Sequence, residues 1–167
     1  MSNKTGIYVT TNASLARDAV KLYADLKSMN ETERLNLIFS NSFERNEESN
    51  ADLVETLKES LDEKLSKCKS VLIIIKEEQI KDISLLNWEL YTAVRKYNLP
   101  IILSYSFFPQ ELGTMNLYRA YWAKALHELI NNKEIKSVHI AFNKKIIYEC
   151  LRKYSLDVMP EYVITSK

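Results

Sequence analysis

Glycine is nearly absent from this chain of 167 residues, which contains only Gly6 and Gly113. A P-loop and a dinucleotide-binding turn each need several glycines in one turn, because phosphates must approach the backbone closely there. The sequence therefore excludes both motifs. The same shortage argues against a tightly held redox NAD cofactor and against an ATP-driven switch.

Histidine and cysteine are also scarce, with two residues of each. His127 has no second histidine four residues on, so the zinc-protease pattern fails, and no Cys/His cluster has metal-ligand spacing. His139 lies in a predicted strand, where a hydrogen-bonded structural role is favoured over a catalytic one. Cys68 and Cys150 stand far apart, and we expect two free, buried thiols in a reducing compartment.

Neither sign of charge dominates, since the chain contains 23 Lys and Arg residues and 22 Asp and Glu residues. Because the charges are balanced and dispersed, the sequence has no basic patch of the kind that binds nucleic acid or an acidic membrane surface. Residues 1–12 lack the pattern of a signal peptide, and the longest strongly apolar run, Val71–Ile75, is too short to cross a bilayer. We therefore expect a cytoplasmic protein that binds neither nucleic acid nor membrane.

Short β-rich segments alternate with longer helical patterns along the whole chain. Strands are predicted at 6–11, 35–40, 71–75, 100–105 and 137–142, and helices after Ser14 and Asn50 and over 85–97, 116–132 and 143–154. The residues after 155 show little periodicity. Strand starts roughly thirty residues apart indicate a parallel sheet with right-handed crossovers. The prediction is one α/β domain over 1–167, with a core of about 6–154: a flavodoxin-like, five-stranded parallel sheet with helices on both faces.

Ligands of such sheets bind beyond the carboxyl ends of the strands, so the chemistry of the loops after Thr11, Ser40, Ile75 and Tyr105 matters most. A response-regulator receiver would need an aspartate at the end of the third strand, where this chain has Ile75-Lys76. Phosphoacceptor function is therefore not supported.

Glu89 is the acidic residue that the pattern places nearest this edge. Ser84 can cap its helix, which puts Glu89 in the second turn, beside the apolar positions of Leu85 and Leu86. A carboxylate there is partly desolvated unless it has a partner. Position alone leaves two interpretations open, a catalytic carboxylate and a glutamate that complements the helix dipole. Trp88 is likewise compatible with packing or with substrate stacking.

Several segments resemble the core of TIR-like domains, most closely those acting in bacterial Thoeris antiphage defence. The resemblance covers residues 6 to about 154. Ser137–Lys145 is similar to the "h-I-x-F-x-K" strand–helix junction of that group, and Tyr121-Trp122 stands where the group has a variable helical insert. The remaining matches are Cys68–Ile75, Asn87-Trp88-Glu89 and Leu99–Ile102.

The resemblance implies an enzyme that takes NAD⁺ as substrate, needs no resident cofactor, and breaks the bond between nicotinamide and ribose. Such domains can close the product into a cyclic ADP-ribose isomer, which signals to a downstream effector; self-assembly and an infection-derived trigger are further expectations. Glu89 would be the catalytic glutamate. The first-strand loop, here Thr10, Thr11 and Asn12, would bind the substrate together with Trp88, the residue before the glutamate. The loop after the second strand, here Ser42 and Phe43, would gate the site, and Phe43 would also contact the substrate.

One carboxylate is enough for this reaction. Nicotinamide leaves a cationic pyridinium and becomes neutral, so it needs no general acid, whereas ordinary glycoside hydrolysis typically uses two carboxylates. Positive charge develops on the ribosyl carbon, which a preorganised carboxylate stabilises. The dryness of the pocket then decides whether water or the molecule's own adenine or ribose captures the cation.

The chain also departs from the family's pattern. Its first strand reads Tyr8-Val9-Thr10-Thr11 instead of aromatic-x-Ser-aromatic, and the turn Lys76-Glu77-Glu78 lacks the usual glycine. These departures favour one alternative, a non-catalytic TIR-like interaction module. A nucleoside deoxyribosyltransferase-like enzyme is another, against which the absence of a second acidic residue in the first-strand loop counts.

Overall fold

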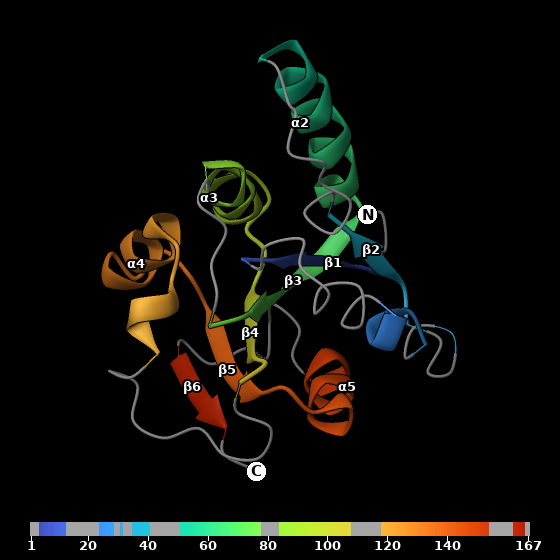
Figure 1. The fold of residues 1–167 in the computed structure, drawn as a ribbon, viewed down its shortest axis with the longest axis vertical. Coiled ribbons are helices and arrows are strands. Elements are labelled where there is room, and N and C mark those ends of the chain that lie inside the picture. The colour runs from blue at the N-terminus through green and yellow to red at the C-terminus, as the bar shows by residue number, and fades with distance from the viewer. Residues whose placement is uncertain are drawn as a thin grey trace.

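Six parallel strands form one sheet with helices on both of its faces, as the computed structural model in Figure 1 shows. The structure describes residues 4–12, 24–28, 31, 35–40, 51–77, 84–107, 118–153 and 162–165. The strand order is β2-β1-β3-β4-β5-β6, so the first five strands have the predicted flavodoxin-like 2-1-3-4-5 order. The strands are β1 Gly6–Thr11, β2 Leu37–Phe39, β3 Cys68–Ile75, β4 Ile101–Tyr105, β5 Ser137–Ala141 and β6 Tyr162–Thr165.

The sixth strand is an addition to the predicted sheet. β6 pairs in parallel with β5, from Tyr162 beside Ser137 to Thr165 beside Ile140. The tail shows little periodicity because a strand of 4 residues places too few side chains on each face for an alternation to be read. The five predicted strands are thus confirmed, and the sheet continues one strand further.

The described part of the chain includes the helices α2 Ala51–Ser66, α3 Ser84–Tyr91, α4 Lys124–Asn131 and α5 Lys144–Lys153. Residues 24–28 are also helical, in agreement with the helix predicted after Ser14, whose beginning lies outside the described residues. α3 continues as a π-helical turn over Thr92–Lys96, and Asn98 follows with a φ of 53°, in the left-handed region that ends helices. The predicted helix over 85–97 is therefore confirmed.

The helix predicted over 116–132 is interrupted within its described part. A 3₁₀ turn over Arg119–Tyr121 is followed by Trp122 in an extended conformation with a ψ of 139°, and α4 begins only at Lys124. The break has a physical reason. The indole Nε1 of Trp122 donates a hydrogen bond of 2.9 Å to the hydroxyl of Tyr105, and a polar group that is buried needs such a partner.

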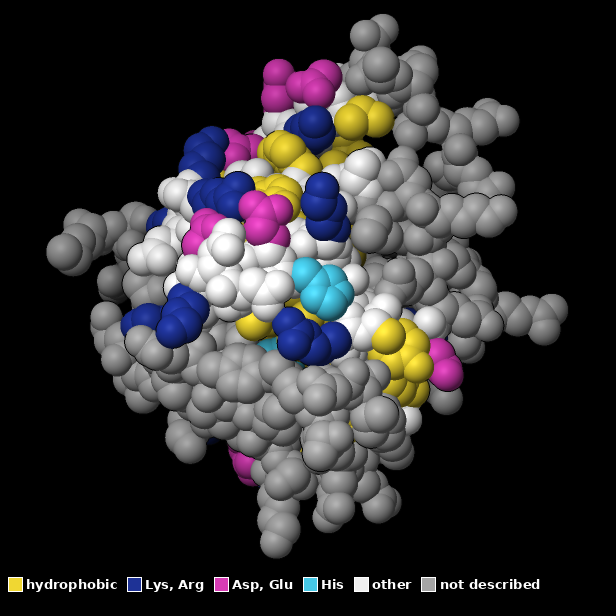
Figure 2. Space-filling model, turned by 90° about the vertical axis from the view of Figure 1, so that its left-hand side faces the viewer, with side chains coloured by type: hydrophobic (Ala, Val, Ile, Leu, Met, Phe, Trp, Pro, Cys, Tyr) yellow, Lys and Arg dark blue, Asp and Glu magenta, His cyan; other side chains and the backbone are white. Residues whose placement is uncertain are grey.

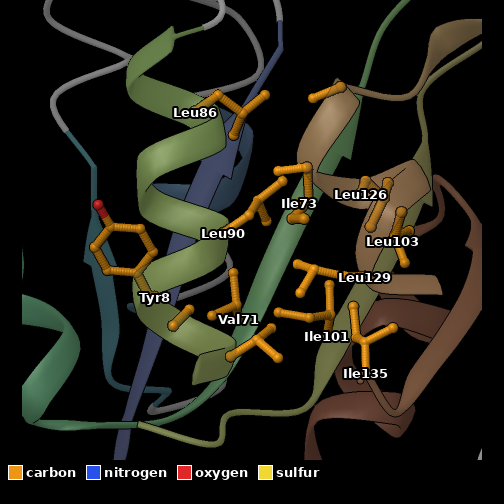
Figure 3. Close-up of a cluster of buried hydrophobic side chains, with 14 of the residues drawn as sticks. Tyr8, Val71, Ile73, Leu86, Leu90, Ile101, Leu103, Leu126, Leu129 and Ile135 are labelled. Carbon is orange, nitrogen blue, oxygen red and sulfur yellow. The ribbon is translucent and has the colours of Figure 1, made fainter. Parts of the chain in front are cut away.

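Two apolar clusters lie on the two faces of the sheet, and the alternation along β3 separates them. Val71, Ile73 and Ile75 pack with α2, α3 and α4, whereas Leu72 and Ile74 pack with α5 and with Leu26. The prediction that this apolar run is a central strand covered on both faces is confirmed. Figure 3 shows how Leu86 and Leu90 of α3 meet Ile73 and Val71 of β3.

The surface carries mixed charges, and no helix on the described part of the chain is long and apolar enough to cross a membrane. Arg95 lies 3.0 Å from a carboxylate oxygen of Glu128 and 2.9 Å from one of Glu134. Figure 2 shows Lys and Arg side chains lying among Asp and Glu side chains on the described part of one face.

Candidate active site

Glu89 points from α3 into the protein interior. It is the sixth residue of the helix, and it lies between Leu86 and Leu90, both of which are buried. Its own exposed fraction is 1%, so the expected partial desolvation is in fact complete. α3 follows β3, hence it starts from the edge of the sheet at which the carboxyl ends of the strands lie. This places the second turn of the helix over the last residues of the strands.

Three hydroxyl groups donate hydrogen bonds to the Glu89 carboxylate. Tyr8 donates to Oε1 at 2.6 Å and Ser40 donates to the same oxygen at 2.5 Å, while Thr10 donates to Oε2 at 3.1 Å. Tyr8 and Thr10 are two residues apart on β1, so their side chains share one face of the sheet. Ser40 directly follows β2, the neighbour of β1. We call these four residues, Glu89, Tyr8, Ser40 and Thr10, the Glu89 cluster.

The cluster provides what a buried carboxylate requires. A charge removed from water is destabilising unless hydrogen bonds replace its hydration, and hydroxyl donors supply that replacement here. Burial raises the pKa of Tyr8 far above its ordinary value, and the negative charge of Glu89 raises it further. The phenol therefore keeps its proton and remains a donor to the carboxylate at every physiological pH.

Thr11 and Asn12 tie the end of β1 to the end of β3. The Thr11 hydroxyl donates to the Ile74 carbonyl at 2.8 Å. The Asn12 side chain accepts from the backbone N–H of Lys76 at 2.7 Å and donates to the Lys76 carbonyl at 3.1 Å and the Tyr121 carbonyl at 3.3 Å. Of the three first-strand residues predicted to bind substrate, Thr10 is thus the one that contacts Glu89. The other two hold the strand ends in register.

The side chains of the tripeptide Asn87-Trp88-Glu89 lie in three different environments. Asn87 accepts a hydrogen bond from the backbone of α4, and Glu89 enters the cluster. Trp88 is half-buried, with the Lys58 ammonium of α2 at 5.8 Å from its ring centre, an arrangement suited to packing between helices. Ser42 and Phe43, the predicted gating residues, lie outside the described residues.

His139 has the structural role that the sequence predicts. Its imidazole is buried; Nδ1 lies 2.8 Å from the Tyr105 hydroxyl and Nε2 lies 3.3 Å from the Ser137 hydroxyl. Burial lowers the pKa of His139 to about 3, so the ring stays neutral. Both cysteines are free and buried, as predicted, and burial raises the pKa of the Cys68 thiol to about 12.

Two members of the Glu89 cluster, Tyr8 and Ser40, were not among the predicted site residues. The sequence does hold a signal for Tyr8, because it shares a strand face with Thr10. Ser40 gives a weaker signal, a hydroxyl at the end of a short strand. Among the described residues, no three His, Cys, Asp or Glu side chains gather in a way that could hold a metal ion.

Comparisons with known proteins leave the chain without an assigned family. No family model matches it, and no curated protein matches it. Among solved structures, it is similar to the crystal structure of a conserved protein from Enterococcus faecalis V583. The two chains are 14% identical, with 98% of this chain and 91% of the other covered at a TM-score of 0.46.

Proposed function

We propose that this protein is a TIR-like, NAD⁺-processing enzyme of antiphage defence, with Glu89 as its catalytic residue. The observation that carries the proposal is the buried Glu89 carboxylate, which hydroxyl groups of β1 and of the residue after β2 hold at the carboxyl edge of the sheet. Ligands of doubly wound sheets bind at this edge. A desolvated, preoriented carboxylate is the group that a reaction through a ribosyl cation requires.

The proposed reaction breaks the bond between the nicotinamide nitrogen and C1′ of the ribose. The electron pair of that bond goes to the pyridinium nitrogen, and nicotinamide leaves as a neutral molecule. C1′ becomes cationic, and the negative charge of Glu89 stabilises it. Water then attacks C1′ and releases a proton, giving ADP-ribose, or a nucleophilic atom of the same molecule closes a cyclic isomer.

The remaining parts of the proposal follow from the resemblance. Thr10 is the substrate-binding candidate that lies beside Glu89. The resemblance adds Thr11, Asn12, Phe43 and Trp88 as further substrate-binding candidates. The product would act as a signal that activates an effector in the cytoplasm. Neither a metal nor a resident cofactor has a place in this chemistry.

Chromatography of small molecules from cells tests the proposal. Cells expressing the wild-type protein, cells expressing Glu89→Gln and cells with an empty vector are extracted with and without phage infection. We expect nicotinamide and an ADP-ribose isomer to rise, and NAD⁺ to fall, in the wild-type cells alone. Equal NAD⁺ and nicotinamide levels in all three cultures after infection would contradict the proposal.

A non-catalytic interaction module is the second candidate, and one observation favours it. Both oxygens of the Glu89 carboxylate accept hydrogen bonds inside the protein, which also suits a residue that serves only to hold α3 on the sheet. The two candidates differ in a measurable way. A structural Glu89 predicts that Glu89→Gln changes thermal stability but no metabolite, whereas a catalytic Glu89 predicts the loss of NAD⁺ cleavage in a folded protein.

A further inference from the structure

We infer that Tyr8 and Ser40 form a positioning pair, which anchors Oε1 of Glu89 and so holds the proposed catalytic carboxylate in one orientation. The inference rests on the proposed function and deepens it, because it names the residues that orient the proposed catalytic carboxylate. It also assigns roles to two residues that the sequence did not single out.

The distances distinguish the two oxygens. A carboxylate oxygen accepts hydrogen bonds along two lone-pair directions, and Oε1 already receives the Tyr8 and Ser40 hydroxyls at 2.6 and 2.5 Å. Those lengths are typical of strong O–H···O⁻ bonds, whereas the 3.1 Å from Thr10 to Oε2 is longer than that range. Oε1 is therefore held tightly by two donors, and because the carboxylate is planar, holding one oxygen fixes the orientation of the whole group.

The anchors come from rigid parts of the fold. Tyr8 is a fully buried residue of β1, and its backbone is paired with β2 on one side and β3 on the other. Ser40 donates its backbone N–H to the Val9 carbonyl at 2.8 Å, which fixes its position next to β1. A glutamate has several rotatable bonds, and anchoring one oxygen from two strands fixes them before substrate arrives. Such preorganisation is what charge stabilisation in a transition state needs.

Removing each anchoring hydroxyl tests the inference. Tyr8→Phe and Ser40→Ala delete one donor each. Ser104→Ala is the matched control, because it also deletes a buried hydroxyl, but one that donates to the Ala141 carbonyl and not to Glu89. We expect kcat for nicotinamide release to fall by about 10- to 100-fold in the first two variants, with KM within about 2-fold of wild type. Ser104→Ala should keep the wild-type kcat, and Ser40→Thr, which retains a hydroxyl, should recover most of the activity.

A spectroscopic measurement completes the test without relying on turnover. In protein labelled with ¹³C at glutamate carboxyl carbons, the Glu89 signal is assigned by its loss in Glu89→Gln. We expect this signal to move in Tyr8→Phe and Ser40→Ala and to stay in place in Ser104→Ala. An unmoved signal, or a wild-type kcat in Tyr8→Phe, overturns the positioning pair while leaving Glu89 catalytic. A fully active Glu89→Gln protein, or a wild type that never cleaves NAD⁺, overturns the proposed function and the pair with it.

Discussion

The side-chain oxygen of Asn87 accepts a hydrogen bond of 2.8 Å from the backbone N–H of Ala125. The N-cap residue of α4, Ala123, has no side chain that could cap the helix, so α3 supplies the missing acceptor from outside. Two residues further along α3, Glu89 enters its hydroxyl cluster. One short stretch of α3 therefore fixes the neighbouring helix and presents the proposed catalytic group.

Replacing Asn87 with alanine should weaken α4. Loss of a capping acceptor costs about 1 kcal/mol, and in a chain of this size such a loss lowers Tm by roughly 2–4 °C. Thermal unfolding followed by circular dichroism measures the change. Asn87→Asp is the control, because its carboxylate can still accept the hydrogen bond and suits a helix N-terminus. Equal Tm values for Asn87→Ala and the wild type would show that the cap contributes nothing.

The buried His139 makes stability depend on pH. Its pKa is about 3 in the folded protein against an ordinary value of 6.5, because burial disfavours the charged ring. Below the pKa that His139 has in the unfolded chain, the unfolded chain binds a proton at this residue and the folded chain does not. The contribution of the neutral, buried ring to the free energy of unfolding is therefore complete above about pH 6.5, and it is lost as the pH falls toward the pKa of His139 in the folded protein.

Urea unfolding at several pH values tests this account of His139. Between about pH 6 and about pH 4, the wild type should lose up to about 1.4 kcal/mol per pH unit through this residue. His139→Gln, which keeps a polar side chain but cannot be protonated, should show a correspondingly flatter dependence. Identical slopes for the two proteins would mean that His139 is protonated in the folded state.

Gly6 occupies a position that has no room for a side chain. A Cβ there would lie 2.7 Å from Cδ1 of Ile38 and 2.9 Å from the carbonyl oxygen of Lys67. Gly6→Ala should therefore destabilise the protein by about 1–3 kcal/mol, measured by urea unfolding. Shortening the neighbour in Gly6→Ala/Ile38→Val should recover only part of the loss, because the Lys67 carbonyl belongs to the backbone. Full recovery of stability would show that the steric clash involves the Ile38 side chain and not the Lys67 carbonyl.

The sequence was sufficient to predict the arrangement of the sheet because each central strand carries a strong local pattern. The run Val71–Ile75 is apolar at every position, and a strand covered on both faces needs that composition. Other features depend on contacts far along the chain. The break at Trp122 reflects a hydrogen bond to Tyr105, and β6 depends on pairing with β5; neither produces a periodicity of its own.

The candidate site was predictable in part for the same reason. Helical spacing placed Glu89 beside Leu85 and Leu86, and the structure buries all three. The identity of its partners could not be read locally, because Tyr8 and Ser40 lie 81 and 49 residues away along the chain. Only the pairing of β1 with β2 brings those two hydroxyls together.

The most direct test of the central claim is nicotinamide release by a Glu89→Gln protein. NAD⁺ labelled in its nicotinamide ring is added to lysates of phage-infected cells that express the wild type, Glu89→Gln or Glu128→Gln. Glu128 is the matched control, a glutamate of α4 that pairs with Arg95 at the surface. We predict labelled nicotinamide from the wild type and Glu128→Gln, and none above background from a Glu89→Gln protein with wild-type circular dichroism. Release at the wild-type rate by folded Glu89→Gln would contradict the account.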